Sequence, residues 1–184
     1  MEHKSYNTVL EIIWILLKGP GHVRGMARAL GINHMSVSRG IKTLIEQNVL
    51  DYREDGRNKV FFLKKTSEAR SFAIMAESYR LVRALEKYPE LRKIAESMQA
   101  DGRIGIAMIF GSYAKGLAKK GSDIDLYVET QDAKLKRDIA GLDPRLSVKA
   151  GSFDREGMLA KEIMKNHIIV KGIEEFYGKA GILG

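Results

Sequence analysis

The sequence predicts a chain of mixed α+β or α/β class built from two small domains. Three observations support this prediction: the length of 184 residues, helical spacing of apolar residues in the first third, and short apolar strands after residue 100. The predicted order is helices with a hairpin, then a helical segment, then a small mixed sheet with helices. The predicted boundaries are 1–66, 67–99 and 100–184, with the middle segment as a connector or dimerisation helix.

The charge of the chain favours a polyanionic partner. The formal net charge is +8, and the window 18–65 alone holds ten basic and four acidic residues. Such a cluster indicates nucleic acid before membrane. The chain has no cysteine, which excludes disulfides, thiolate metal sites and a cysteine nucleophile and fits a cytoplasmic location. The apolar run Val9–Leu17 contains Glu11 and is about half the length that crosses a bilayer.

Three helices and a hairpin are predicted in the N-terminal part. Apolar residues three or four apart predict helices over Asn7–Lys18, Val23–Leu30 and His34–Gln47. Gly31 provides the left-handed turn between the second and third helices, and Asn33 is the expected N-cap. The β-prone runs Val49–Arg53 and Lys59–Leu63 flank Asp55-Gly56, which predicts a hairpin.

The third helix has a polar and basic outer face, as a helix in the major groove requires. The candidate DNA-binding residues on this helix and the hairpin are Ser36, Arg39, Lys42, Arg53, Arg57 and Lys59. The segment ALGINHMSVSRGIKTLIEQNVLDYREDGRNKVFFL resembles the winged-helix family of prokaryotic transcription regulators, over about residues 7–66. The resemblance implies binding to duplex DNA. The alternative is that helix and hairpin now serve dimer contacts.

The middle segment is expected to be helical and to support a dimer. Apolar residues are spaced for partial burial along Ser67–Glu86, Pro89 breaks the helix, and Glu90–Met98 restarts it. Helix-turn-helix modules usually bind paired half-sites, so we expect a homodimer, with Ser67–Glu86 as the candidate contact.

The C-terminal part brings together two short motifs. Ile104–Phe110 is predicted as a buried strand, and it leads into Gly111-Ser112 and a helical turn over Tyr113–Leu117. The strand predicted next, Ile124–Val128, begins between Asp123 and Asp125.

The spacing of these residues suits phosphate and metal binding. Asp123 and Asp125 project from the same face because strand residues two apart do so. Such a pair can bind Mg²⁺, which takes one or two carboxylates together with substrate phosphates. Gly111 allows a phosphate to approach the backbone, and Ser112 adds a hydroxyl donor beside a helix start. This combination is typical of phosphoryl or nucleotidyl transfer.

The whole segment GSYAKGLAKKGSDIDLYV resembles the signature of the polymerase-beta-like nucleotidyltransferase superfamily, in particular its minimal archaeal-type members. The later segment KEIMKNHIIVKGIEEFYG resembles how those minimal proteins end, so the resemblance covers about residues 100–178. It implies that Gly111 and Ser112 bind a nucleoside triphosphate (NTP). It also implies that Asp123 and Asp125 are catalytic and hold two Mg²⁺ or Mn²⁺ ions.

One departure from the family pattern leaves the activity open. The resemblance implies a third carboxylate on the next strand, expected over Leu146–Gly151, but this stretch contains Ser147 and Lys149 and no acid. Asp154 and Glu156 lie beyond its end. Two interpretations follow. The chain is a DNA-binding, Mg²⁺-dependent nucleotidyltransferase that transfers a nucleoside monophosphate to an acceptor. Alternatively, it is a transcription regulator whose degenerate transferase domain binds nucleotide or mediates assembly.

Overall fold

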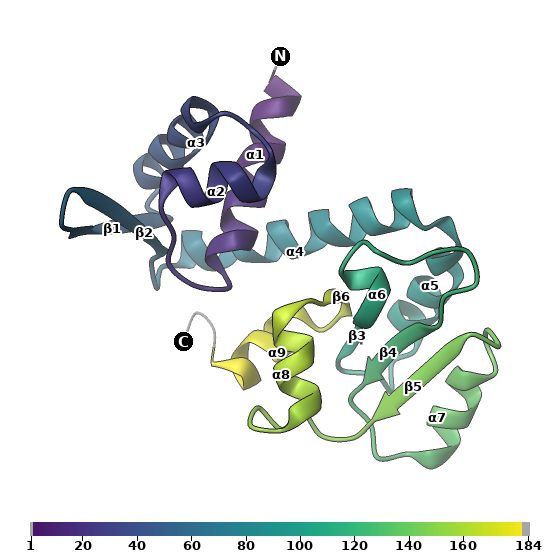
Figure 1. Ribbon diagram of the computed structural model, residues 1–184. Helices are drawn as coiled ribbons and strands as arrows, with labels where there is room; N and C mark the ends of the chain where they lie inside the picture. The colour runs from purple at the N-terminus through teal and green to yellow at the C-terminus, as the bar shows by residue number, and fades with distance from the viewer. Residues whose placement is uncertain (1, 182–184) are drawn as a thin grey trace. The chain divides into compact units, whose positions relative to one another are not determined.

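A computed structural model describes residues 2–181 of the chain, which divide between Tyr79 and Arg80 into two compact units. The mixed α+β class is as predicted, with a winged helix-turn-helix in the first unit and a small mixed sheet with helices in the second (Figure 1). In the described part of the chain, no helix is both long and apolar enough to cross a membrane.

The first unit contains three helices, a hairpin and the beginning of a long fourth helix. The elements are α1 (Glu2–Leu16), α2 (Val23–Leu30), α3 (His34–Glu46), β1 (Leu50–Asp55), β2 (Asn58–Leu63) and α4 (Ser67–Lys87), of which α4 continues into the second unit. The bounds of α2 are as predicted, whereas α1 begins five residues before the predicted start at Asn7.

The turn between α2 and α3 has the predicted local chemistry. Gly31 has φ of 65°, in the left-handed region where a residue without Cβ is favoured. The Asn33 side chain accepts a hydrogen bond of 2.8 Å from the Ser36 amide and so caps α3. Behind the turn, an ideal Cβ on Gly40 would lie 2.8 Å from Cδ1 of Ile12, so α1 and α3 approach closely at this glycine. The apolar positions Val37, Ile41 and Leu44 of α3 are buried in the core.

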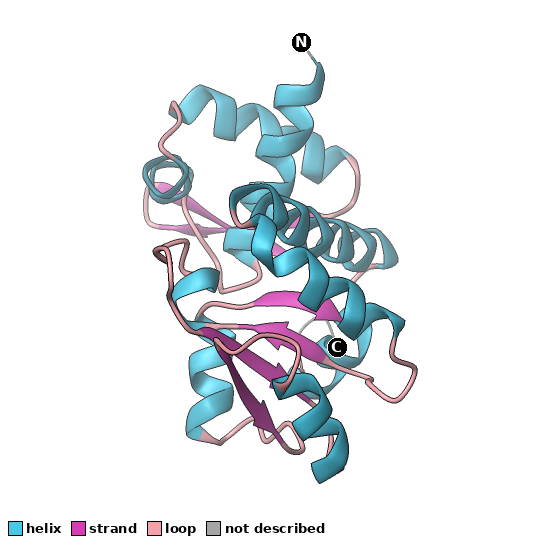
Figure 2. Cartoon of the chain, turned by 90° about the vertical axis from the view of Figure 1, so that its right-hand side faces the viewer, coloured by secondary structure: helices cyan, strands magenta, loops and turns pink. Residues whose placement is uncertain are grey.

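The second unit is built on a four-stranded sheet. Its further elements are the 3-10 turn Pro89–Leu91, α5 (Arg92–Ala100), β3 (Ala107–Ile109), α6 (Gly111–Ala114), β4 (Ile124–Val128), α7 (Ala133–Ala140), β5 (Leu146–Ala150), α8 (Met158–Lys165), β6 (Ile168–Lys171) and α9 (Ile173–Ala180). The strand order is β5-β4-β3-β6, with β4 parallel to β5 and the other pairs antiparallel. Figure 2 shows the four strands with helices on both faces of the sheet.

The two faces of this sheet have different surroundings. Ile124, Leu126 and Val128 of β4 pack in the main core with residues of α5 and α7. Asp125 and Tyr127 alternate with them and so lie on the opposite face. On that side Phe153 stacks edge-on against both Tyr127 and Phe176 of α9, at centroid distances of 6.1 and 5.3 Å.

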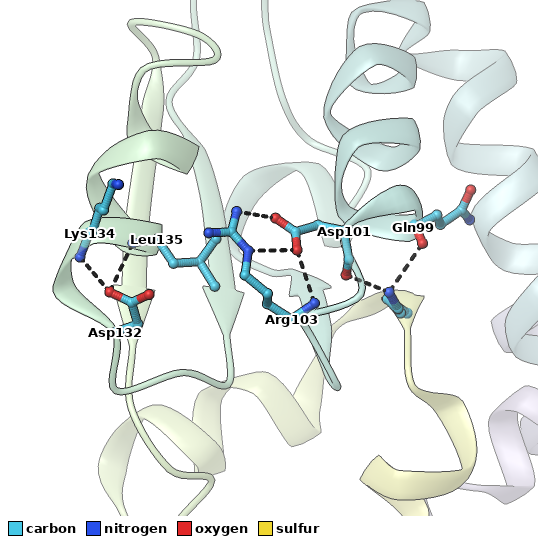
Figure 3. Close-up of polar contacts among 7 residues, drawn as sticks. Gln99, Asp101, Arg103, Asp132, Lys134 and Leu135 are labelled. Carbon is cyan, nitrogen blue, oxygen red and sulfur yellow. Dashed lines mark hydrogen bonds and ion pairs between the residues drawn. The ribbon is translucent and has the colours of Figure 1, made fainter.

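Polar contacts fasten the connection between α5 and β3 (Figure 3). The Arg103 guanidinium donates two hydrogen bonds, of 2.9 and 2.6 Å, to the Asp101 carboxylate. Lys171 at the end of β6 donates to the carbonyls of Gln99 and Asp101. Asp132 caps α7 through the amides of the next turn.

Two predicted elements of the second unit differ from the structure. The strand predicted over Ile104–Phe110 spans Ala107–Ile109, with one further backbone hydrogen bond at each end, and Ile104 is buried although it lies outside the strand. Burial therefore extends beyond the hydrogen-bonded ladder. The helix predicted from Glu90 begins at Arg92, because Pro89 first starts a 3-10 turn.

Candidate functional site

The sheet brings the two sequence motifs of the second unit into direct contact. The Phe110 amide donates a 2.9 Å hydrogen bond to the Asp125 carbonyl, so Gly111 is adjacent to Asp125 as β3 ends. Gly111 has φ of 66°. An ideal Cβ at this position would lie 2.1 Å from Oδ2 of Asp125. A glycine is therefore required by both the backbone conformation and the space beside the carboxylate.

Asp123 and Asp125 lie at the N-terminal end of β4, in different environments. Asp123 is exposed, whereas Asp125 is half-buried. Burial raises the pKa of Asp125, and the negative charges of Glu162 and Asp123 raise it further. Lys149 and Lys115 act in the opposite direction and lower the pKa of Asp125. A cation bound beside Asp125 would relieve this concentration of negative charge.

Glu162 is a residue that the sequence analysis did not identify. It lies on α8, is about half exposed, and forms a 3.9 Å ion pair with Lys115 just after α6. Its charge nevertheless acts on Asp125. The only signal in the sequence was its place in the KEIMKN segment, for which no role was predicted. Among the described residues, no three His, Cys, Asp or Glu side chains gather closely enough to form a metal site.

The register of β4 and β5 places specific residues beside the two aspartates. Ser147 is the partner of Asp125 in the parallel ladder, and Lys149 is the partner of Tyr127. Both lie on the same sheet face as Asp125, because paired residues in a sheet project together. Asp154 and Glu156 follow β5 and are exposed, and the Asp154 carboxylate accepts a hydrogen bond from the Glu156 amide.

Backbone conformation and backbone hydrogen bonds determine the path of the loop after β3. The predicted helical turn over Tyr113–Leu117 is wrong in its bounds, because α6 runs over Gly111–Ala114. Ser112 therefore lies inside the first turn rather than before it. The positive φ of Gly111 allows the chain to turn directly from strand into helix, without a spacer. Further along, the Ser122 hydroxyl accepts a hydrogen bond of 2.9 Å from the Lys119 amide and closes the loop before Asp123.

The candidate DNA-binding residues of α3 lie near its start and on its outer face. Ser36 is half-buried, and its amide is occupied by the Asn33 cap. Arg39 and Lys42 are exposed. Lys42 forms a 3.8 Å ion pair with Glu46, but both side chains are more than 60% exposed, at 79% and 63%. Such an exposed pair holds its partners only weakly, so Lys42 is available to another anion.

The hairpin presents the other three candidates, all of them exposed. Arg53 pairs with Val60 in the antiparallel ladder, and Arg57 lies in the turn between β1 and β2. Lys59 is opposite Glu54, and its ammonium lies 3.9 Å from the centroid of the Tyr52 ring. Arg53 and Arg57 are therefore less engaged by the hairpin than Lys59 is.

Comparison with known proteins supports the interpretation of the second unit. Residues 92–175 match the family described as Polymerase beta, Nucleotidyltransferase. No curated protein matches the chain. The crystal structure of adhesin competence repressor (AdcR) from Streptococcus pyogenes is similar at 27% identity and a TM-score of 0.40. That similarity covers 46% of this chain and 63% of the repressor, less than two thirds of its length.

Proposed function

We propose that this chain is a DNA-binding protein whose second unit binds an NTP with Mg²⁺ and transfers a nucleoside monophosphate to an acceptor. The observation that carries this proposal is the contact between Gly111 and Asp125, where a Cβ would lie 2.1 Å from the carboxylate. In this geometry the backbone of Gly111, which would bind phosphate, is in contact with the Asp125 carboxylate, which would bind the metal. Nucleotidyl transfer requires these two sites side by side.

Asp123 and Asp125 fit a divalent cation by their chemistry. Two carboxylates at the start of one strand suit Mg²⁺ or Mn²⁺, which complete their coordination with water and phosphate oxygens. The bound ion would neutralise charge on the triphosphate. The Ser112 hydroxyl and the backbone after Gly111 orient the phosphates, and Lys115 provides a further positive charge where α6 ends.

A second function is favoured by the residues of β5. Ser147 stands beside Asp125 in the sheet, and Lys149 contributes a positive charge to the same face. A lysine here repels a second cation, which supports a site with one metal ion. The alternative is therefore a transcription regulator that binds NTP·Mg²⁺ and transfers nothing, using the nucleotide as a signal or for assembly.

Calorimetry with each of the four NTPs, with and without Mg²⁺, tests the nucleotide site. We expect wild-type protein to bind at least one NTP in a Mg²⁺-dependent way. Asp123→Asn together with Asp125→Asn keeps the shape of the site but removes two charges, so binding should become weak and indifferent to Mg²⁺. Asp138→Asn, on the exposed side of α7, is the matched control and should bind as wild type does.

Absence of any Mg²⁺-dependent NTP affinity at millimolar ligand would exclude both forms of the proposal. Transfer is tested separately with NTPs labelled at the α-phosphate. Label recovered on protein, nucleic acid or a small acceptor supports the transferase. Binding without transfer supports the regulator.

DNA binding is proposed for α3 and the hairpin. The support is the winged-helix arrangement of the first unit together with exposed basic residues on both elements. A homodimer remains part of this proposal, because paired recognition helices would bind paired half-sites. Met75 and Val82, seven residues apart on α4, are exposed at 39% and 51% and are the candidate apolar contacts. Light scattering at about tens of micromolar should report the dimer, and a monomer would exclude it.

A further inference from the structure

The second half of α4 contacts the loop Gly111–Gly116 through two basic side chains. Nη2 of Arg80 donates a 2.9 Å hydrogen bond to the carbonyl of Ala114, and Nζ of Lys87 donates one of 2.8 Å to the carbonyl of Gly116. Residues seven apart lie on one face of a helix. Ala84 lies between them on this face and is buried in the same core as Ala114. Its small side chain suits a close approach of α4 to the loop.

Three further carbonyls of the loop accept hydrogen bonds from nearby backbone amides. Backbone amides contact them in the pairs Lys115 with Gly111, Gly116 with Tyr113, and Leu117 with Ser112, at 2.9 to 3.1 Å. Below the loop, the Tyr88 ring packs edge-on against Tyr113 at a centroid distance of 4.9 Å. Arg80 and Lys87 thus bond two carbonyls that these amides leave to other donors.

We propose that Arg80 and Lys87 are positioning residues for the bound nucleotide. They fix the loop so that Ser112 and the backbone beside Asp125 keep one orientation before the triphosphate arrives. A loop ordered in advance does not have to be ordered on binding, and affinity rises accordingly. This inference rests on the proposed NTP site. It assigns to α4 a role that neither the sequence motifs nor their resemblance indicated.

Two variants test the positions separately. Lys87→Met keeps the aliphatic stem of an exposed residue but removes the donor, and Arg80→Met does the same for a half-buried one. Each should weaken NTP binding by about tenfold, as expected for loss of a charged hydrogen bond. Unlike substitution of Asp123 and Asp125, neither should abolish the dependence on Mg²⁺. Lys87→Arg should restore most of the affinity, and Lys136→Met on the exposed face of α7 should leave it unchanged.

Hydrogen exchange without nucleotide separates positioning from direct contact with phosphate. The amides of Lys115–Leu117 should exchange faster in Lys87→Met and Arg80→Met than in wild type, and Lys87→Arg should restore their protection. Should Arg80→Met fail to fold, Lys87→Met alone decides. If wild type binds NTP and the variants bind it equally well, this inference alone is overturned. The same holds if the variants bind more weakly but their loop amides exchange as in wild type. Absence of NTP binding in wild type overturns the proposed function and this inference with it.

Discussion

The candidate DNA-binding face and the candidate nucleotide site are built in opposite ways. On α3 and the hairpin, Arg39, Lys42, Arg53 and Arg57 are exposed and loosely held. At the nucleotide site, Gly111 contacts Asp125 so closely that no side chain fits. The first region depends on charges that reach outward, and the second depends on the path of the backbone. Each substitution in the first region should therefore lower DNA affinity by a modest amount. A single substitution in the second region should abolish most of the NTP affinity.

The sharpest test of this difference is Gly111→Ala. The added methyl would lie 2.1 Å from Oδ2 of Asp125, and φ of 66° is unfavourable for alanine by roughly 1–2 kcal/mol. Either the loop must shift or the Asp125 side chain must turn away from it. We expect NTP affinity measured by calorimetry to fall by at least about a hundredfold, equivalent to roughly 3 kcal/mol. Gly102→Ala, where a Cβ meets no atom within 4 Å, should bind normally. Equal binding by the two variants would contradict the assigned geometry.

A smaller and graded effect is expected for Arg39→Ala combined with Lys42→Ala. Each contact to a phosphate contributes about 0.9 to the slope of log affinity against log salt. The double variant should weaken DNA binding at low salt and lower the slope by about 2. The control removes two charges elsewhere, by Arg92→Ala with Lys93→Ala on α5. An unchanged affinity and slope would exclude these two residues from the DNA contact.

Lys149→Asp tests whether the nucleotide site can gain a metal ion. The substitution replaces a positive by a negative charge on the face that carries Asp125, where like charge opposes a second cation. We expect one Mn²⁺ per NTP-bound wild-type chain and two per chain in the variant, counted by electron paramagnetic resonance. Lys161→Asp makes the same charge change at an exposed position of α8 and should not raise the count. Two ions in wild type would refute the one-metal interpretation.

The smallest effect concerns stability at acid pH, to which two Asp–Arg pairs of the second unit contribute. Hydrogen bonds from Arg103 and Arg145 lower the pKa of Asp101 and of Asp143 from 3.8 to about 2. A lowered carboxyl pKa stabilises the fold above the unfolded value, and this contribution is lost as pH falls toward the folded value. Arg103→Gln with Arg145→Gln should lower the melting temperature slightly at pH 7, and the difference from wild type should shrink toward pH 2. A difference independent of pH would mean that these pairs act only by packing.

Turn and capping residues in the sequence predicted much of the fold. Gly31 and Asn33 determine where α2 ends and α3 begins, because each acts on its own backbone. The strand Ile124–Val128 was predicted with its exact bounds. The antiparallel pairing of β3 with β4 then brings Gly111 to Asp125, as expected for two motifs on adjacent strands.

The remaining features depend on contacts between distant residues. Glu162 acts on Asp125 from 37 positions away, and an exposed glutamate on an amphipathic helix carries no local signal of that role. Arg80 and Lys87 donate to backbone carbonyls. Because every residue has a carbonyl, the sequence gives no signal of which one accepts these bonds. The start of β3 was misjudged because Ile104 is buried but lies outside the paired strand.

The continuity of α4 has a consequence for how the protein unfolds. Ala69 and Ala76 belong to the core of the first unit, and Ala84 belongs to that of the second. A helix forms and melts cooperatively along its length, so loss of either core exposes apolar surface on an element that the other core needs. Melting of α4 would therefore remove apolar residues from both cores. A protease cut between Tyr79 and Arg80 should leave each core with its own part of α4, whereas a cut nearer either end of the helix should take apolar residues away from one core.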